Sequence, residues 1–506
     1  MALTKLLDGI YAAAEDERIT GIFMHGAPGE TGWASSREIR KALLDFRDHG
    51  KQIYAWFRDF DERTYYFGST ANNLWAAPFG SFSYDGFAAE ISYYAKLLEK
   101  IGVQVQVSRV GKYKSAVEPF LLEEMSDANR EQIANLLGDL FDVCLADSAA
   151  ARGIEESHLR EITETVGIIK VDEAASRGLI DEVLYFDQVL EKLNLISPDG
   201  DNFAQITLSS YAATLEAPEV DDSGGVVALV YAEGEIYDGK GDDGVAGDTI
   251  ARALRELRQD EDVDAVVMRV NSPGGSAAAS EFILREVELL RAAGKPVVVS
   301  MGDVAASGGY WISSRADHIL VQPNTITGSI GVFGMFPEIS GLLDLVGVNI
   351  ETVKTGKVAD AMSINRPLST TELEIIQTFI DEIYVAFIER VASGRAMSPE
   401  AVREIAQGRV WSGRDAIEIG LADGFGSIDE AAEIAARLAG LENWSMRLPT
   451  VEEPGLVDVV LSSMLEESDD EGLAQLKQTL RVLDYIPRLG SRQGIYAMLP
   501  YNLVIK

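Results

Sequence analysis

Strand-like hydrophobic runs alternate with amphipathic helical patterns along two stretches of the chain. In the first stretch, the runs lie at 19–24, 52–57 and 73–76, with helical patterns at 35–48 and 62–69 between them. In the second, the runs lie at 263–270, 296–300 and 318–321, with a helical pattern at 280–293. Strands that alternate with helices predict an α/β fold with largely parallel sheets in both stretches.

The two stretches share their order of elements and nearly their spacing, which indicates an internal duplication. Three pairs of turn residues are each 245 positions apart: Pro28 with Pro273, Pro78 with Pro323, and Gly111 with Gly356. The second copy opens with a β-prone run at 225–235 that has no counterpart at the start of the first. Two explanations are open: the first copy has lost its leading strand, or that strand lies outside this sequence.

Length and composition suggest how the chain is divided. A chain of 506 residues is too long for a single compact core. A polar stretch separates the copies, and a long amphipathic helix at 370–396 follows the second. The expected units are a first copy at 1–196, a linker at 197–223, a second copy at 224–440 and a C-terminal extension at 441–506.

Charge and composition exclude several classes of function. The formal net charge of −37 argues against binding nucleic acid or anionic lipid. The single cysteine, Cys144, allows no intrachain disulfide, and its apolar helical surroundings predict a buried thiol. No window approaches 18 consecutive apolar residues, and the acidic N-terminus lacks the apolar core of a signal peptide. We expect neither a metal nor a cofactor.

A turn of very small residues, ASGG at 306–309, follows the β-branched run of the second copy and precedes a helical pattern. Two interpretations of Ser307 in this turn are open. It is either a helix cap beside glycines that allow close packing, or a nucleophile placed where a helix N-terminus favours a developing oxyanion. The preceding turn SPGG at 272–275 can present backbone N–H groups, which together with Gly308 N–H would form an oxyanion hole.

A nucleophilic serine needs a base. The four histidines lie in contexts that favour structural roles: His25, His49, His158 and His318. Lysine is the alternative, because burial lowers its pKa. In the aligned copies Arg63 stands opposite Ser307, whereas Ala359 stands opposite Lys114. One copy has thus kept the serine and the other the lysine, as expected for one composite active site, although Lys114 could equally be an ordinary surface lysine.

Taken together, several segments resemble the long, duplicated type of the signal peptide peptidase A family, within the Clp-protease/crotonase superfamily. The resembling segments are RVNSPGGS (269–276), GKPVVVSMGDVAASGGYWIS (294–313), TGSIGVFG (327–334), RVWSGRDAIEIGLAD (409–423) and, in the first copy, RVGKYKSAVEPF (109–120). The fold implied by the resemblance is two tandem Clp/crotonase-like ββα repeats with mostly parallel sheets plus helical segments, assembled as a bowl-shaped homotetramer.

The resemblance also implies an activity and a role for each site residue. It implies a serine endopeptidase that cleaves hydrophobic peptides such as remnant signal peptides, with Ser307 as nucleophile and Lys114 as general base. Ser329 is expected to hydrogen-bond the lysine, and Gly275 and Gly308 to form the oxyanion hole. Family members of this type carry an N-terminal membrane anchor before the point corresponding to Met1, so membrane proximity is implied while the location stays open.

Two other functions remain as alternatives at this point. A crotonase-type acyl-CoA enzyme could be built on related α/β units, although its chemistry usually requires acidic residues near the oxyanion pocket. An inactive scaffold that captures hydrophobic segments would keep the same fold without using Ser307.

Overall fold

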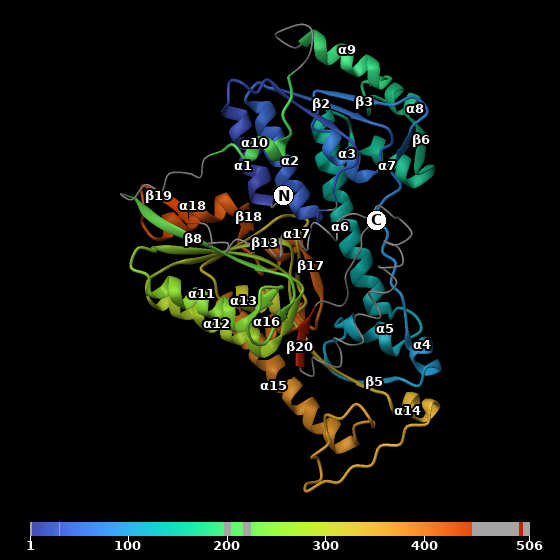
Figure 1. Cartoon of the computed structure of the whole chain (residues 1–506), viewed down its shortest axis with the longest axis vertical. Helices are drawn as coiled ribbons and strands as arrows, with labels where there is room; N and C mark the ends of the chain where they lie inside the picture. The colour runs from blue at the N-terminus through green and yellow to red at the C-terminus, as the bar shows by residue number, and fades with distance from the viewer. Residues whose placement is uncertain (1–2, 30, 197–203, 216–223, 448–494, 499–506) are drawn as a thin grey trace.

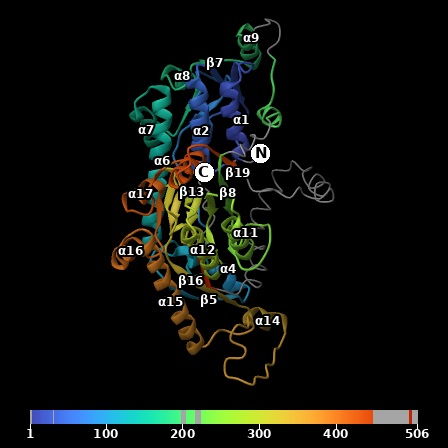
Figure 2. The ribbon, with the colours of Figure 1, turned by 90° about the vertical axis from the view of Figure 1, so that its left-hand side faces the viewer.

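The computed structural model describes residues 3–29, 31–196, 204–215, 224–447 and 495–498. The molecule is elongated, with the central sheet of the first copy in its upper part, the second copy below, and α4 (Ala95–Lys100), α5 (Glu118–Leu121) and β5 (Gln104–Val110) of the first copy beside the second (Figure 1). A single long helix, α6 (Asp127–Arg152), runs from the first copy down along the second. The two copies therefore pack against each other, as the view turned by 90° also shows (Figure 2).

The two copies have equivalent central sheets, which confirms the α/β prediction. The first copy contains parallel strands in the order β1 (Gly21–His25), β2 (Gln52–Phe57), β3 (Asn73–Ala76) and β7 (Glu182–Val183). The second repeats this order with β11 (Ala265–Ser272), β13 (Val297–Ala306), β14 (His318–Val321) and β18 (Gly424–Phe425). The same strand order in both copies supports the duplication inferred from the spacing of the turn residues.

The second copy carries extra strands beside this common core. Strand β8 (Gly225–Glu233) pairs with β11, and β19 (Trp444–Arg447) pairs with β8. In the first copy, β1 is the edge strand of its sheet among the described residues. Among the described residues, no strand takes the place beside β1 that β8 takes beside β11. Long runs of buried β-branched residues in β11 and β13 are typical of parallel strands covered on both faces.

Helices connect the strands in both copies. In the first copy they are α1 (Leu3–Glu15), α2 (Trp33–Asp48), α3 (Glu62–Gly68), α4 (Ala95–Lys100), η1 (Ser115–Val117), α5 (Glu118–Leu121), α6, α7 (Glu156–Thr165), α8 (Val171–Ser176) and α9 (Phe186–Ile196). In the second they are α11 (Gly247–Gln259), α12 (Ala277–Ala292), α13 (Gly308–Ser313), α14 (Ser340–Val346), α15 (Thr370–Gly394), α16 (Pro399–Ile405), α17 (Gly413–Glu418) and α18 (Ile428–Leu438).

Local sequence explains the ends of the longest helices. Helix α6 begins where the Ser126 side chain accepts a hydrogen bond from the backbone of Asn129, and it ends at Gly153 in the left-handed region. Helix α15 begins with a capping box between Ser369 and Glu372. Cys144 lies fully buried in α6, as its apolar surroundings predict.

A second sheet joins the two copies directly. Strand β5 (Gln104–Val110) of the first copy pairs antiparallel with β16 (Val332–Glu338) of the second, over seven residue pairs. The remaining strands of this sheet are β9 (Ile236–Tyr237), β10 (Val245–Ala246), β12 (Gly274–Ser276) and β20 (Ile495–Met498). Because β5 pairs with β16, it leads the first-copy chain into the second copy.

The remaining short strands lie outside this sheet. Strand β15 (Ile326–Gly328) pairs with β13 and with β17 (Val410–Ser412), and β4 (Ser81–Ser83) pairs with β6 (Ile168–Lys170).

Two expectations need correction. The expected linker contains a helix, α10 (Leu208–Ala212), which packs on α1 and whose Tyr211 hydroxyl donates to Asp16. The strand expected to stop at 300 instead continues to Ala306, because residues 304–306 pair with β15. The parts of the linker at 197–203 and 216–223, and most of the C-terminal extension, lie outside the described residues.

A buried ion pair holds the copies together. Glu38 on α2 accepts a hydrogen bond from the Arg269 guanidinium on β11 at 2.5 Å, and both side chains are at most 3% exposed. Arg269 also donates to Ser300 Oγ at 2.9 Å. Burial raises the pKa of the Glu38 carboxyl, and the Arg269 charge opposes that rise. Removing one partner would leave the other charge buried and unpaired.

We predict that Arg269→Met lowers the free energy of unfolding by roughly 3–5 kcal/mol, because it leaves the Glu38 carboxylate buried without its partner. The double variant Glu38→Leu/Arg269→Met should recover most of that loss, since it removes both charges. The matched control is Arg285→Met, which breaks the exposed pair with Glu288 and should cost less than about 1 kcal/mol. Chemical denaturation measures all three, and equal losses in Arg269→Met and the control would contradict the prediction.

Candidate active site

Ser307 lies at the junction of β13 and α13, in a strained backbone conformation. Its φ is 57° and its ψ is −113°, a region that non-glycine residues rarely adopt. It occupies the position of a helix cap, yet its side chain makes no capping hydrogen bond. The backbone N–H of Ser307 donates to Gly328 O at 2.8 Å, which fixes the turn. The hydroxyl is therefore directed away from the helix end that it would otherwise cap.

Lys114 reaches this hydroxyl from the other copy. It lies between β5 and η1, and the whole residue is buried. Its Nζ is 2.7 Å from Ser307 Oγ, 3.0 Å from Ser329 Oγ and 2.9 Å from Ser329 O. The structure thus brings together Ser307, Lys114 and Ser329, three residues singled out from the sequence.

The surroundings of Lys114 favour a neutral amine. Its three hydrogen-bond partners are uncharged oxygens, and burial lowers the pKa of its ammonium well below the usual value. A neutral amine has two N–H donors and one lone pair. Donation to the two Ser329 oxygens leaves the lone pair free to accept the hydroxyl proton of Ser307.

Ser329 is held as firmly as Ser307. It also has a positive φ, 51°, and its backbone N–H donates to Arg409 O at 2.6 Å. It is fully buried. Two strained serines on either side of one buried lysine are the kind of backbone outlier that gathers at functional sites.

Glycines line the side of Ser307 opposite the lysine. Gly308 is the first residue of α13, so its N–H has no partner within the helix. Gly274 Cα would lie 3.1 Å from a methyl group added at Gly308, which places β12 against the start of α13. Gly275 follows in β12 and pairs with Ile236 of β9. The glycine in contact with Gly308 is therefore Gly274, which the sequence analysis did not single out.

The histidines lie in other surroundings, as their sequence contexts predict. His25 stacks on Phe23 at 5.0 Å, and His49 Nδ1 lies 2.9 Å from Asp45 O. His318 Nδ1 lies 4.0 Å from an Asp423 carboxylate oxygen. The base within hydrogen-bond distance of Ser307 is a lysine.

Comparison with known proteins assigns the chain that carries this site to a family. The sequence pattern described as "Peptidase family S49" matches residues 45–196 and 289–442. The chain belongs to peptidase family S49. It is accordingly a serine peptidase, and the two matched regions, which begin 244 positions apart, support the duplication.

Similar proteins cover most of the chain. "Protease 4" of Salmonella typhi is 40% identical, over 92% of this chain and 76% of that protein. "Protease 4" of Haemophilus influenzae is 35% identical, over 90% and 78% respectively. "Serine protease SPPA, chloroplastic" of Arabidopsis thaliana is 32% identical, over 87% and 66%. These relatives support the resemblance to signal peptide peptidase A. Across the described ranges of this S49 peptidase, no helix has the length and apolar character needed to cross a membrane.

The equivalent place in the first copy is filled by other side chains. Arg63 donates to Ser36 Oγ at 2.9 Å, and its guanidinium lies 4.6 Å from the centre of the Trp33 ring. The peptidase therefore has an arginine packed on tryptophan where the second copy has Ser307. This substitution agrees with the loss of the nucleophile inferred for the first copy.

A loop of the second copy supports Lys114 from behind. Gln407, at a φ of 56°, accepts a hydrogen bond from Tyr113 N at 2.9 Å. A methyl group added at Gly408, where φ is +76°, would lie 2.6 Å from both Lys114 N and Lys114 Cβ. The lysine backbone thus rests on a position where only glycine leaves room. The sequence analysis missed this contact, because an isolated Gln-Gly pair carries no signal of its partner.

Two polar side chains of α6 hold the same turn from its other side. Gln132 Nε2 donates to Tyr113 O at 3.0 Å and to Ser115 Oγ at 2.9 Å. Ser115 Oγ in turn donates to Asn129 Oδ1 at 2.9 Å. Both amide residues are buried, so the turn that carries Lys114 is fixed by satisfied polar contacts.

We predict that Gly408→Ala lowers kcat/KM of the peptidase roughly 10–100-fold, because the added methyl displaces Lys114 from Ser307. The matched control is Gly420→Ala, which has a similar φ of +80° but only Met397 Sδ nearby, at 3.9 Å. Both variants should lose similar stability in thermal melting. An equal loss of activity in the control, or full activity in Gly408→Ala, would show that this contact does not position the lysine.

Proposed function

We propose that the protein is an endopeptidase with a Ser/Lys dyad, in which Ser307 is the nucleophile and Lys114 the general base. The observation that supports this proposal is the distance of 2.7 Å between the hydroxyl of Ser307, whose backbone is strained, and the amine of Lys114, which is fully buried and has no charged partner. Burial supplies the lowered pKa that a lysine base needs near neutral pH.

The proposed reaction uses the geometry in two steps. Neutral Lys114 takes the Ser307 proton as Oγ attacks the peptide carbonyl, and the N–H groups of Gly308 and Gly275 stabilise the oxyanion. Lys114 then gives the proton to the leaving amine. A water molecule, deprotonated by the Lys114 amine, then releases the acyl group from Ser307. Ser329 accepts hydrogen bonds from Lys114 throughout, so it is proposed to orient the lone pair.

We propose hydrophobic peptides in extended conformation as the substrates, remnant signal peptides among them. Apolar side chains form one cluster next to the segment that carries Lys114: Val107, Ala116, Val117, Phe333 and Met335. An extended peptide can pair with the strands beside Ser307, which recognises its backbone, while these side chains favour apolar residues. "Putative signal peptide peptidase SppA" of Enterococcus faecium, 38% identical over 36% of this chain, supports this substrate class. Signal peptides reside in membranes, so the proposed cleavage takes place beside a membrane.

We predict that Ser307→Ala lowers kcat at least roughly 10³-fold and that Lys114→Met lowers it roughly 10²–10⁴-fold, the contribution expected of a general base. The matched control is Lys112→Met, which removes an exposed lysine two residues away and should keep wild-type activity. Hydrolysis of a fluorogenic hydrophobic peptide measures all three. Full activity in Lys114→Met would disprove the dyad.

The pH profile tests the same dyad. Only the neutral amine acts as a base. We therefore expect kcat/KM to be low at pH values below the lowered pKa of Lys114 and to rise as the pH passes through that pKa. The midpoint should lie well below the ordinary lysine value of 10.5. A midpoint near 10.5 would mean that the lysine is not buried in the active enzyme.

We further propose that chains assemble head to tail into the homotetramer that the resemblance implies. Within the chain, β5 of the first copy pairs with β16 of the second. At the spacing of 245, the counterpart of β5 is 349–355, and the counterpart of β16 is 87–93. Among the described residues, neither counterpart belongs to an assigned strand, although Ala89 lies in an isolated β-bridge. A second chain could therefore supply the longer strand pairing at both places. Repetition of this one contact around a ring closes the assembly without a free end.

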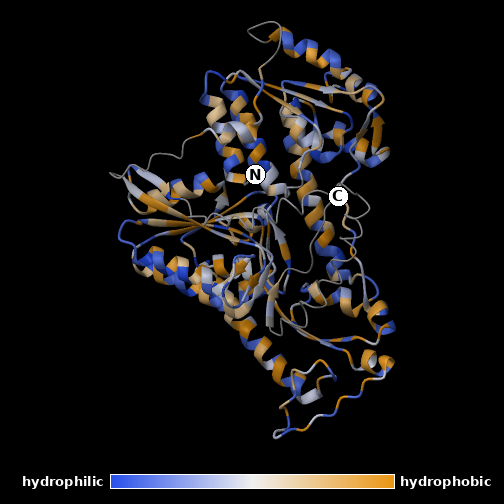
Figure 3. Ribbon diagram, viewed as in Figure 1, coloured by the Kyte–Doolittle hydropathy of each residue, from blue (hydrophilic) through white to orange (hydrophobic). Residues whose placement is uncertain are grey.

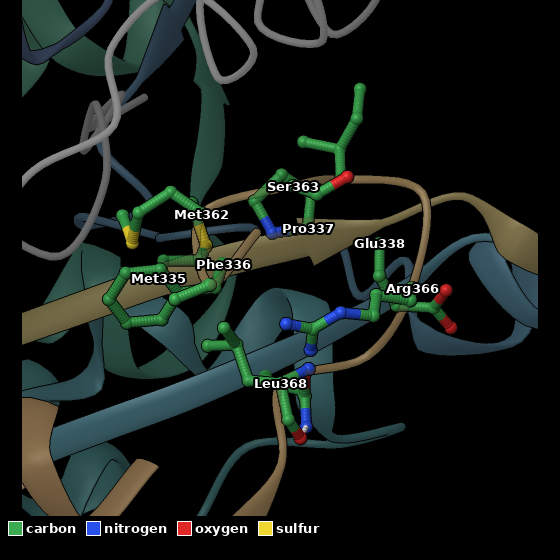
Figure 4. A pocket seen from close by; sticks show the side chains of 11 residues that line it. Met335, Phe336, Pro337, Glu338, Met362, Ser363, Arg366 and Leu368 are labelled. Carbon is green, nitrogen blue, oxygen red and sulfur yellow. Dashed lines mark hydrogen bonds between the residues drawn. The ribbon is translucent and has the colours of Figure 1, made fainter. Parts of the chain in front are cut away.

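The arm that carries 349–355 has the character of an interface. It follows α14, where hydrophobic residues gather at the end of the molecule (Figure 3), and it stands away from the core in both ribbon views. Val353 is 99% exposed, and Val348, Ile350 and Val358 are about half exposed. The end of the arm returns to β16, where Met335, Phe336 and Leu368 line a pocket (Figure 4). A single chain therefore exposes apolar surface on a segment that is anchored at its base.

We predict that Val353→Asp splits the assembly into smaller species, because it places a charge in the proposed junction. Size-exclusion chromatography with light scattering measures the mass of each form. The matched control is Leu195→Asp, which changes an 83%-exposed leucine on α9 of the first copy and should leave the assembly intact. A wild-type protein that elutes as a monomer, or an unchanged mass in Val353→Asp, would refute the head-to-tail contact.

A further inference from the structure

A bulge interrupts β13 just before Ser307. The pairing of β13 with β11 is regular up to Met301 and resumes at Ala305, and the register shifts between them. Three residues of β13, at 302–304, therefore lie opposite the single residue Asn271 of β11. Across the same stretch, the other edge of β13 changes its partner from β14 to β15. A β-bulge re-aims the side chains that follow it, and such bulges are common beside active sites.

Two of the three bulge residues are held from within the second copy. The Thr325 hydroxyl donates a hydrogen bond to Gly302 O at 2.9 Å. The backbone N–H of Val304 donates to Asn271 Oδ1 at 3.1 Å. These contacts fix the backbone on either side of the middle residue, Asp303.

Asp303 makes its hydrogen bonds to the first copy. Its carboxylate accepts from Ser35 N at 2.8 Å and from Ser35 Oγ at 2.6 Å. Ser35 is the third residue of α2, and Gly32, at the N-cap of α2, has no side chain with which to bond it. Asp303 thus supplies, from the other copy, the acceptor that an N-cap side chain normally provides. The contact joins α2 to β13 across the junction of the two copies (Figure 1).

Gly32 shows how closely the two copies meet at this point. A methyl group added at Gly32 would collide with the Asp303 carboxyl group. The φ of Gly32 is −67° and its ψ is 164°, so the backbone itself would accept any residue. The space left by the absent side chain is therefore the space that the Asp303 carboxylate occupies.

The first copy has an aspartate at the equivalent position, but that aspartate is bonded differently. Asp59 precedes Arg63 by four residues, as Asp303 precedes Ser307. Asp59 Oδ1 accepts hydrogen bonds from the backbone N–H and the hydroxyl of Ser81 in its own copy, both at 2.8 Å. In the copy that carries Ser307, the equivalent carboxylate is instead bonded to the copy that carries the lysine.

We propose that Asp303 is a positioning residue, which sets the place of Ser307 relative to Lys114 by tying the bulge of β13 to α2 of the first copy. The proposal rests on the Ser/Lys dyad proposed above. The segment that carries Lys114 is joined to the second copy by the pairing of β5 with β16. Asp303 makes a separate tie, four residues from Ser307. This tie keeps the bulge from relaxing, and with it the strained backbone of Ser307, whose φ is 57°.

The test measures kcat and KM of the full-length protein for a fluorogenic hydrophobic peptide, with kcat expressed per folded molecule. Asp303→Ala should lower kcat roughly tenfold and leave KM within about twofold of wild type, because a displaced hydroxyl slows the chemical step. Asp303→Asn should restore most of the activity, since its amide can accept from Ser35 N and donate to Ser35 Oγ. A loss in Asp303→Asn as large as in Asp303→Ala would overturn the proposal.

The matched control is Asp59→Ala, which removes the two equivalent hydrogen bonds in the first copy. It should keep the wild-type kcat, because Asp59 is not bonded across the junction of the copies. An equal loss of kcat in Asp59→Ala and Asp303→Ala would mean that any weakening of the fold slows the enzyme. That result would overturn the role of Asp303.

A double variant tests whether the contact itself acts. Gly32→Ala should lower kcat about as much as Asp303→Ala, because the added methyl group displaces the carboxylate. In Asp303→Ala the same methyl group has room. Gly32→Ala/Asp303→Ala should therefore be no slower than Asp303→Ala alone. Losses that add up would show that the two residues act separately, and would overturn the proposal.

The outcomes separate this proposal from the dyad beneath it. A wild-type kcat in Asp303→Ala, beside an inactive Ser307→Ala, overturns the positioning role and leaves the dyad standing. An active Ser307→Ala contradicts the dyad itself. The pH profile gives a further readout: Asp303→Ala should keep the wild-type midpoint of kcat/KM, because Lys114 stays buried. A shifted midpoint would mean that the loss acts through the Lys114 amine, and would overturn the assignment to Ser307.

Discussion

The structure depends on the burial of a lysine without a counter-charge. Lys114 is fully buried, and its partners are the neutral oxygens of Ser307 and Ser329. A buried ammonium in such a place would cost several kcal/mol, so burial favours the neutral amine, and no ion pair fixes its position. Backbone contacts must hold it instead. The turn rests on Gly408 and is bound by Gln132, which explains why rigid, closely packed main chain surrounds a side chain that is usually found in water.

The same constraint explains why the two copies are intertwined. A lysine stays dry most easily between two packed units, and here one unit supplies Lys114 and the other Ser307. Strand pairing between β5 and β16 and the buried pair of Glu38 with Arg269 keep the units in register. If the proposed dyad is the active site, each copy of the duplicated protein is free to lose the half that the other supplies. Arg63 packed on Trp33 in the first copy agrees with that proposal.

The sequence revealed those parts of the molecule that leave a local pattern. Strands at 73–76 and 318–321 were predicted with their observed bounds, because β-branched runs end at turn residues. The pairing of Lys114 with Ser307 was anticipated from what each copy lacks. The support from Gly408 was not, because it joins residues far apart in the chain through backbone conformation alone. Strand β20 was missed for a similar reason, since an apolar run near the end of a chain does not indicate which strands it joins.

In the proposed function, a substrate pairs with strand edges beside Ser307, which recognise its backbone; the proposal therefore requires an unpaired extended segment first and particular side chains only second. Folded proteins present few such segments, so they would not be cleaved by a serine that is buried in this way. The apolar cluster next to the segment that carries Lys114 adds the second filter. Phe333 and Val117 provide apolar surface there, which favours apolar residues in the peptide.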